Sequence, residues 1–238
     1  MVAWLFSGGG ESEVKGLILL LRKLFPSCNF ERKTPIRHRP GSRPSTSRAG
    51  YGRTSQSLAA EITSRLRSAL ARGSCDLLIV FDDLDCRSEA VERQRFNDAI
   101  DAAQAELPIS KCIGFAAPEL ESWIIAMWNE SVARHPDFRM RHERMRHWLS
   151  TQKNVFFDSP ESFGTFDQSK NSCLDKLSDA IIESTTIHDA DRELPRYSKA
   201  EHTPDLLQCM DTTVVNIVKS KCPLFRQFYH ALCAFVES

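Results

Sequence analysis

The 238-residue sequence has no long apolar run and no signal for secretion. Its longest apolar stretch, residues 17–21, is followed by Arg22 and Lys23, whereas a bilayer-spanning helix needs roughly 20 apolar residues. The chain does not open with a basic segment followed by a long apolar stretch, as a signal peptide would. We therefore expect a cytoplasmic protein without a membrane partner.

Paired cysteine motifs are also missing, although the chain has 8 cysteines. None falls in a CxxC pair, and no cysteine and histidine set has zinc-finger spacing. In a cytoplasmic chain of this size the sequence predicts small, mostly buried thiols. The cysteines are Cys28, Cys75, Cys86, Cys112, Cys173, Cys209, Cys222 and Cys233.

The chain has no excess of positive charge, because 31 Lys and Arg residues balance 31 Asp and Glu residues. Proteins that hold nucleic acid through non-specific phosphate contacts usually carry a positive balance. Any such binding must come from local clusters or from a partner. One cluster, residues 32–53, has no acidic residue and is expected to be an irregular loop, either a solvated linker or a phosphate-contacting arm. Its candidate phosphate contacts are Arg37, Arg39, Arg43, Arg48 and Arg53, and a further candidate, Arg93, lies on a later charged helix.

Apolar periodicity predicts alternating strands and helices in residues 1–130. Strands are expected at residues 2–6, 76–81 and 111–116, and helices at 11–25, 57–70, 88–106 and from Pro118 to 127. This order is typical of an α/β fold with a mostly parallel sheet flanked by helices. Residues 131–238 are expected to form a mostly helical extension packed on that domain. They begin with a basic stretch, 134–147, which is either a solvated face or a second phosphate-binding face.

Acidic residues follow the predicted strands, where functional groups of parallel sheets gather. Asp83 and Asp85 follow the most apolar strand, Glu11 and Glu13 follow a glycine loop, and Glu119 and Glu121 follow the strand at 111–116, so these groups are expected to converge on one edge. Oxygen ligands of this kind suit Mg²⁺. The spacing predicts a metal site built from Glu11, Glu13, Asp83 and Asp85 with Glu121 nearby, although a DDLD run is also typical of a solvated turn or a helix cap.

Four short motifs resemble those of small stand-alone TOPRIM-like proteins related to the nuclease domain of overcome-lysogenization-defect (OLD) enzymes. They are SGGGESE at residues 7–13, VFDDLDC at 80–86, APELESW at 117–123 and YSKAEHT at 197–203. The resemblance implies a TOPRIM-like fold, a Mg²⁺ or Mn²⁺ cofactor, a nucleic-acid substrate and an AAA/ABC-type ATPase partner in phage defence. It also implies five catalytic residues, which are Glu13, Asp83, Asp85, Glu121 and Lys199.

One position departs from the family pattern, because Gly9 stands where the first glutamate of its EGxTE-like motif would be. Either Glu11 or Glu13 replaces that glutamate, or the domain binds without cleaving. The leading hypothesis is a metal-dependent nuclease subunit, and the chain has no P-loop of its own. The alternatives are a non-catalytic adaptor or sensor that docks on a partner ATPase, and an enzyme acting on a small nucleotide. The sequence leaves the oligomeric state open, and it is compatible with a homo-oligomer.

Overall fold

The computed structural model describes residues 1–36, 53–103, 109–188, 191 and 193–237. Its central sheet has the strand order β2-β1-β3-β4, and every neighbouring pair is parallel. The strands are β1 (Val2–Ser7), β2 (Asn29–Arg32), β3 (Leu77–Asp83) and β4 (Lys111–Ala116). This confirms the predicted α/β class and is consistent with a TOPRIM-like fold. The short edge strand β2 was not predicted, because its sequence, NFER, has a single apolar residue.

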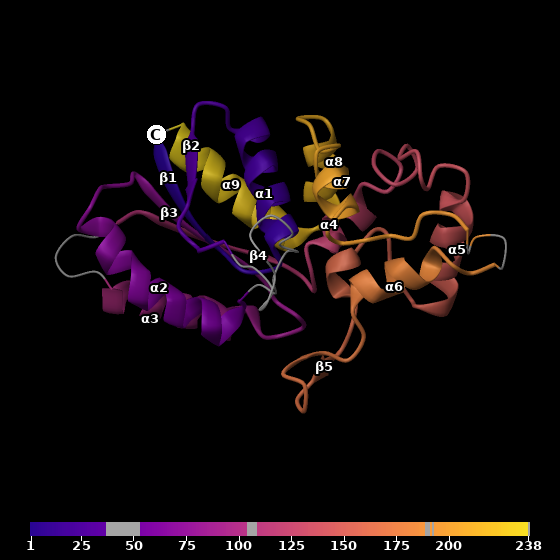
Figure 1. The fold of residues 1–238 in the computed structure, drawn as a ribbon, viewed down its shortest axis with the longest axis horizontal. Helices are drawn as coiled ribbons and strands as arrows, with labels where there is room; N and C mark the ends of the chain where they lie inside the picture. The colour runs from indigo at the N-terminus through magenta and orange to yellow at the C-terminus, as the bar shows by residue number, and fades with distance from the viewer. Residues whose placement is uncertain (37–52, 104–108, 189–190, 192, 238) are drawn as a thin grey trace.

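Helices cover both faces of the sheet, and the alternation of side chains along β1 explains how (Figure 1). Trp4 and Phe6 pack with α2 (Ser55–Leu70) and α3 (Glu89–Ala103) on one face. Ala3 and Leu5 point to the other face, toward α1 (Glu11–Leu24) and α9 (Pro223–Val236). Successive side chains of a strand point to opposite faces, so a strand buried on both sides reads as a continuous apolar run.

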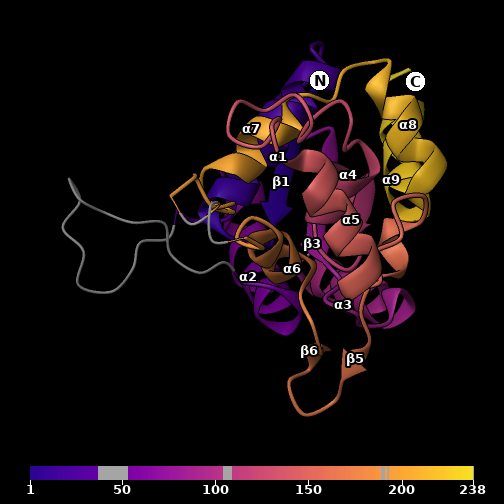
Figure 2. The same cartoon turned by 90° about the vertical axis from the view of Figure 1, so that its right-hand side faces the viewer.

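Residues beyond 116 form a predominantly helical layer that continues the core on the α1 and α9 side. Its helices are α4 (Glu121–Ala126), α5 (His142–Gln152), α6 (Leu177–Ser184), α7 (His202–Leu207) and α8 (Val214–Lys221). The short hairpin of β5 (Phe166–Asp167) and β6 (Ser172–Cys173) projects from the body (Figure 2). None of the described helices has the length and apolar character required to cross a membrane.

Two glycines allow helices to approach closely at positions that matter for the site. A Cβ at Gly114 of β4 would lie 2.2 Å from a ring carbon of Phe228, which anchors α9 on the sheet. A Cβ at Gly16 of α1 would lie 2.9 Å from the Cα of Pro204 in α7. The backbones of α1 and α7 therefore nearly touch, and this contact brings the segment around residue 199 to the sheet edge.

Candidate active site

Four carboxylates converge on one lysine at the carboxyl edge of the sheet. Lys199 Nζ lies 2.9 Å from Glu13 Oε1, 3.2 Å from Glu119 Oε1 and 3.3 Å from Glu121 Oε2. The fourth carboxylate, Asp83, is the last residue of β3 and interacts electrostatically with both Glu13 and Lys199. We call Glu13, Asp83, Glu119 and Glu121 the carboxylate cluster. The structure thus brings together four of the five predicted catalytic residues, Asp85 being the exception.

The glycine loop places Glu13 in this cluster. Gly9 has a positive φ of 82°, and the backbone N–H of Gly10 donates to Glu13 Oε2, so the side chain folds back over the start of α1. A Cβ at Gly9 would lie 3.0 Å from that same oxygen. Glu13 therefore fills the space beside Gly9, where the family pattern has a glutamate.

Glu11 does not join the cluster, although it was predicted as a metal ligand. Its two carboxylate oxygens each accept a hydrogen bond of 2.6 Å from the guanidinium of Arg32 on β2. Such bidentate pairing is the strongest arrangement available to an arginine and a carboxylate. Glu11 holds β2 to the start of α1.

Asp83 and Glu121 are buried, which disfavours their charged forms. Burial raises the pKa of Asp83 well above its ordinary value, and the neighbouring Glu13 raises it further. Its Oδ1 accepts the Leu120 N–H at 3.0 Å. Glu121 has no exposed surface, and burial raises its pKa to about 7. Thr203 donates to Glu121 Oε1 at 3.0 Å, which ties α4 to α7.

Glu119 lies at the edge where the sequence placed it, but it was not among the predicted catalytic or metal-binding residues. Ser178, in the first turn of α6, donates to it from its backbone N–H at 2.9 Å and from its hydroxyl at 3.1 Å. Although burial opposes ionisation, Lys199 and the Ser178 N–H hold the pKa of Glu119 below its usual range. The signal was present in the sequence, because Glu119-Leu120-Glu121 follows β4 as Asp83-Leu84-Asp85 ends β3.

Lys199 remains protonated in this setting. Burial opposes its charge, but Glu121, Glu13 and Glu119 together raise the pKa of the ammonium. One lysine faces four carboxylates, so the cluster carries excess negative charge when Asp83 and Glu121 are ionised. Glu13 Oε1 and Glu121 Oε2 meet the ammonium at ion-pair distance without the alignment of a hydrogen bond.

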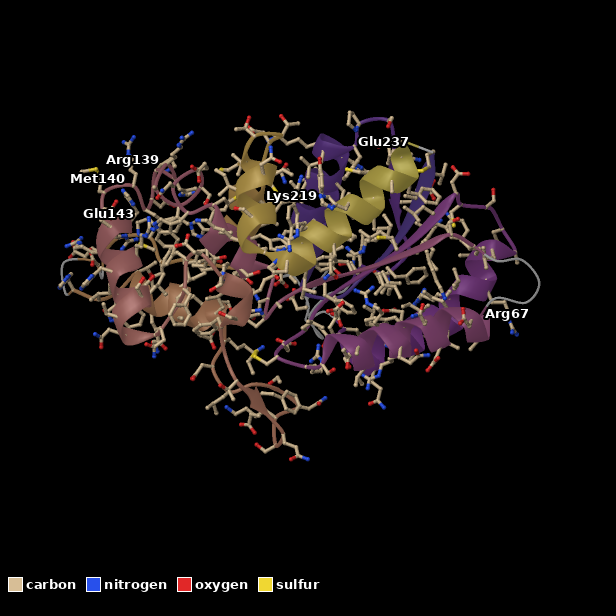
Figure 3. All side chains as sticks on the ribbon, turned by 180° about the vertical axis from the view of Figure 1, so that it is seen from behind. Arg67, Arg139, Met140, Glu143, Lys219 and Glu237 are labelled. Atoms are coloured by element: carbon tan, nitrogen blue, oxygen red, sulfur yellow. A yellow bond between two sulfur atoms is a disulfide. The ribbon has the colours of Figure 1, made fainter. Side chains whose placement is uncertain are left out.

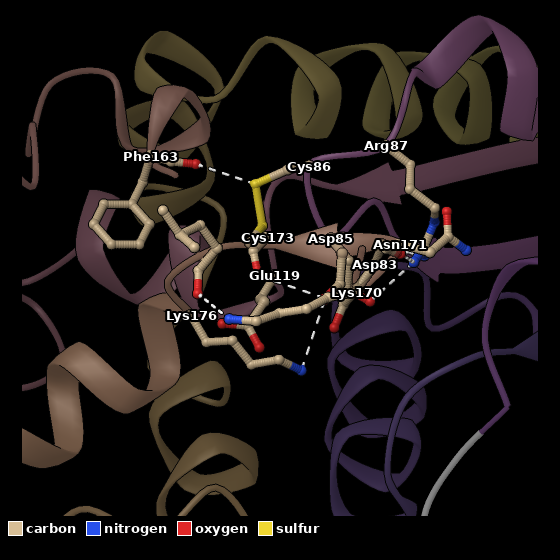
Figure 4. Close-up of a disulfide and its surroundings, with 12 residues drawn as sticks. Asp83, Asp85, Cys86, Arg87, Glu119, Phe163, Lys170, Asn171, Cys173 and Lys176 are labelled. Carbon is tan, nitrogen blue, oxygen red and sulfur yellow. Dashed lines mark hydrogen bonds and ion pairs between the residues drawn. A yellow bond between two sulfur atoms is a disulfide. The ribbon is translucent and has the colours of Figure 1, made fainter. Parts of the chain in front are cut away.

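Asp85 lies beside Asp83 and Glu119 at the border of the cluster and interacts electrostatically with both, but its ion-pair partners are Arg87 and Lys176 (Figure 4). Positive φ angles at Asp85 and Cys86, 45° and 62°, turn the chain sharply after β3. Its carboxylate lies 3.3 Å from Arg87 and 4.0 Å from Lys176. Burial raises the pKa of Asp85, and Arg87 opposes that shift. Asp83 and Asp85 are therefore close enough to interact, but they face different cations.

Arg87, which was not predicted, organises the turn after β3. Its side chain is 7% exposed, donates to the Asp83 carbonyl at 2.7 Å and lies within 4 Å of the Asp82, Asp85 and Glu92 carboxylates. Asp82 is fully buried opposite Gly8, and burial raises its pKa to about 8.

A disulfide joins Cys86 to Cys173 beside Asp85, which corrects the prediction of thiols alone (Figure 4). The two cysteines are 87 residues apart and belong to no local motif, so their spacing could not predict the bond. The β5–β6 hairpin brings Cys173 to the end of β3. The remaining cysteines are free, and Cys28, Cys112 and Cys222 are buried as expected.

The predicted phosphate contacts do not gather at the cluster in the described part of the chain. Arg37, Arg39, Arg43 and Arg48 lie outside the described residues. Arg53 is exposed, with its carbonyl next to Gly8. Arg93 pairs with Glu89 at 2.6 Å and donates to the Ile113 carbonyl at 2.9 Å. In the second basic stretch, Arg141 is buried and donates to the carbonyls of Thr185 and Pro195.

The carboxylate cluster fits Mg²⁺ or Mn²⁺ in its donor chemistry, because all of its groups are oxygen ligands and its negative charge is only partly neutralised. Lys199 stands among these oxygens and neutralises part of their charge. A second group of possible metal ligands lies elsewhere in the described part of the chain. It consists of His135, Asp137 and His202, and one ligand atom of each lies within 4.8 Å of the others.

No protein-family model, curated protein or solved structure matches this chain. Its function is therefore inferred from the chemistry of the carboxylate cluster and from the four motifs.

Proposed function

We propose that this protein is a metal-dependent nuclease subunit that hydrolyses phosphodiester bonds with the carboxylate cluster. The observation that carries the proposal is the convergence of Glu13, Asp83, Glu119 and Glu121 on Lys199. These residues follow β1, β3 and β4, at the edge where parallel sheets bind ligands. A structural ion pair needs two charged groups, whereas this arrangement buries several carboxylates around one cation.

The cluster would hold Mg²⁺ or Mn²⁺ through Asp83 and Glu119 or Glu121, and the ion would polarise a phosphate oxygen and acidify a bound water. Lys199 would neutralise a phosphate oxygen. Glu121, with a pKa of about 7, is suited to hold or accept a proton at neutral pH. Glu13 is the residue that replaces the glutamate missing at Gly9.

The proposal includes a cytoplasmic role in anti-phage defence with an AAA/ABC-type ATPase partner, which rests on the motif resemblance. The balanced charge of the chain supports a need for help in binding nucleic acid, because 31 positive residues face 31 negative ones. The partner would supply ATP hydrolysis, and the basic loop at residues 32–53 would supply phosphate contacts.

A non-catalytic adaptor is the second candidate, and Lys199 is the observation that favours it. Its ammonium already pairs with three of the four carboxylates, so the protein is stable without a metal at this point. In that case the TOPRIM-like surface would dock on the ATPase, and the lysine would be a permanent replacement for the ion.

The two candidates are separated by digestion of plasmid DNA and single-stranded RNA with Mg²⁺ or Mn²⁺, with and without a candidate partner ATPase. For a nuclease, Asp83→Asn and Glu121→Gln should each lower the rate at least about 100-fold. The control is Asp98→Asn, which changes an exposed carboxylate on α3.

Calorimetry with Mn²⁺ provides the second readout. A nuclease should bind Mn²⁺ in a way that Asp83→Asn abolishes, and an adaptor should show no such binding. Equal activity of wild type and both cluster variants under all conditions would contradict the catalytic proposal.

A further inference from the structure

Two histidines and an aspartate from distant parts of the chain meet beside α7. His135 and Asp137 lie in the turns that follow α4, and His202 is the first residue of α7. One ligand atom from each lies within 4.8 Å of the others, and His202 Nε2 is 3.2 Å from Asp137 Oδ2. We propose that these three side chains form a binding site for one divalent transition-metal ion, with Zn²⁺ as the best-suited ion. This proposal does not depend on the nuclease activity.

The donor set distinguishes this site from the carboxylate cluster. Two imidazoles and one carboxylate match zinc sites that have three protein ligands and an open fourth position. Mg²⁺ prefers oxygen ligands alone, so it is a poor match. The side chain of Asp137 is 36% exposed, which leaves room for a water as the fourth ligand.

The surroundings of His202 supply the second hydrogen bond that metal-bound histidines require. Its Nδ1 accepts the Ser198 N–H at 2.9 Å and also lies 3.3 Å from the Ser198 carbonyl oxygen. Binding of an ion at Nε2 requires the proton to move to Nδ1, so the hydrogen bond accepted from the Ser198 N–H is exchanged for one donated to the Ser198 carbonyl. Ligating histidines are commonly oriented by a backbone carbonyl in this way.

Aromatic packing fixes the rings before any ion binds. The ring centroid of His202 lies 4.8 Å from that of Phe138 and 5.7 Å from that of Tyr197. The His135 ring lies 5.0 Å from Phe138 and 5.3 Å from His202. Because these neighbours already restrict the rotamers, an ion would bind with little additional ordering.

Solvent can reach this site, because His135 and Asp137 are themselves partly exposed and their segment continues to the protein surface. Met140, three residues beyond Asp137, is 87% exposed, and it lies with Arg139 at one end of the molecule (Figure 3). An ion can therefore enter after the chain has folded.

An ion here would fasten the start of α7 to the segment after α4. The same part of the chain carries Lys199 and Thr203, which contact the carboxylate cluster, and α4 carries Glu121. The site would fasten the two segments and so position Lys199, in place of the single His202–Asp137 hydrogen bond that joins them in the absence of metal.

The test is a Zn²⁺ titration by calorimetry on full-length protein freed of metal with a chelator. Wild type should bind one equivalent at this site that Asp83→Asn retains, even though that variant loses any ion held by the carboxylate cluster. His202→Gln and Asp137→Asn should each weaken the retained binding at least about tenfold. Zn²⁺ should also raise the melting temperature of Asp83→Asn, but not that of Asp83→Asn combined with Asp137→Asn. The control His230→Gln, at an exposed histidine of α9, should behave as wild type.

Zn²⁺ binding that is unchanged in Asp137→Asn, or lost in Asp83→Asn, would overturn the proposal. Only weak binding of several equivalents by wild type would overturn it as well. Asp137→Asn preserves the shape of the side chain and an acceptor for His202, so it carries the test even if His202→Gln does not fold. Because the readouts are binding and melting temperature, this outcome is independent of any nuclease assay.

Discussion

The ammonium of Lys199 lies 3.3 Å from the carboxylate of Glu121, which has no exposed surface. The two residues belong to the segment before α7 and to α4, so the ion pair joins parts of the chain that are far apart in sequence. It also places a cation among carboxylates that would otherwise repel one another. The stability of this region and its capacity for metal binding therefore depend on the same lysine.

Replacing Lys199 with methionine should destabilise the protein by about 3 kcal/mol at pH 8, because buried carboxylates lose their counter-charge. The loss should shrink at pH 5, where Asp83 and Glu121, whose pKa values are raised, carry protons. Urea unfolding at the two pH values measures the effect.

The matched control is Lys111→Met, because Lys111 pairs at 3.0 Å with an Asp101 that is 62% exposed. That exposed pair should contribute less than about 1 kcal/mol. If the carboxylate cluster binds metal, Mn²⁺ should stabilise Lys199→Met more than wild type. Equal effects of the two lysine substitutions would contradict the role given to Lys199.

Wild-type stability should fall as the pH rises from 5 to 8. Burial raises the folded-state pKa of Asp82 to about 8 and those of Glu121 and Glu161 to about 7. Below about pH 4 these groups are protonated in both states, whereas at higher pH the folded state binds more protons than the unfolded state, so stability decreases.

Asp82→Asn should remove part of this pH dependence, and at pH 8 it should be more stable than wild type by about 1 kcal/mol or more. Asp98→Asn, at an exposed position on α3, should keep the wild-type profile. Urea unfolding across this pH range checks both. If the free energy of unfolding of Asp82→Asn changes with pH in parallel with that of wild type, Asp82 is ionised in the folded protein over the whole pH range.

Gly114→Ala should destabilise the protein by about 1–3 kcal/mol, because the added methyl group would overlap the Phe228 ring. Adding Phe228→Ala should cost less in this variant than in wild type, since the overlap is relieved. Gly73→Ala is the control, because its Cβ would meet Trp4 at an ordinary 3.7 Å. Thermal unfolding of Gly114→Ala, Phe228→Ala, the double variant and Gly73→Ala measures the coupling between residues 114 and 228. Additive effects of the two substitutions would contradict the contact.

Replacing Cys86 and Cys173 with serine should lower stability by about 2–4 kcal/mol, because their bond closes a long loop of the unfolded chain. Unfolded protein kept from reductant should titrate as six thiols, and as 8 after reduction. Cys209→Ser should leave stability nearly unchanged, since Cys209 is a free and partly exposed thiol. Eight thiols before reduction would mean that the disulfide does not form.

Apolar patterning was sufficient to predict three of the four described sheet strands and the parallel arrangement. Strand β2 escaped prediction because a polar edge strand has no continuous apolar run. The edge at which the acidic residues meet was also predictable, since parallel strands share their carboxyl end.

Side-chain direction within that edge was not predictable. Asp85 lies two residues after Asp83, yet its positive φ turns it toward Arg87 and Lys176. Glu11 lies two residues before Glu13, yet the neighbouring Arg32 binds it. Both outcomes depend on partners contributed by other elements, and sequence spacing contains no information about them.

The contact between Gly16 and Pro204 has a consequence for how the protein is made. During synthesis the ribosome releases the sheet and its first acidic residues long before the segment that carries Lys199 and α7. Until that segment arrives, the nascent chain holds its carboxylates without their counter-ion, and the face beneath α9 stays open to water until residues 223–236 follow. We therefore expect the site to assemble late in folding and chaperones to bind the incomplete chain.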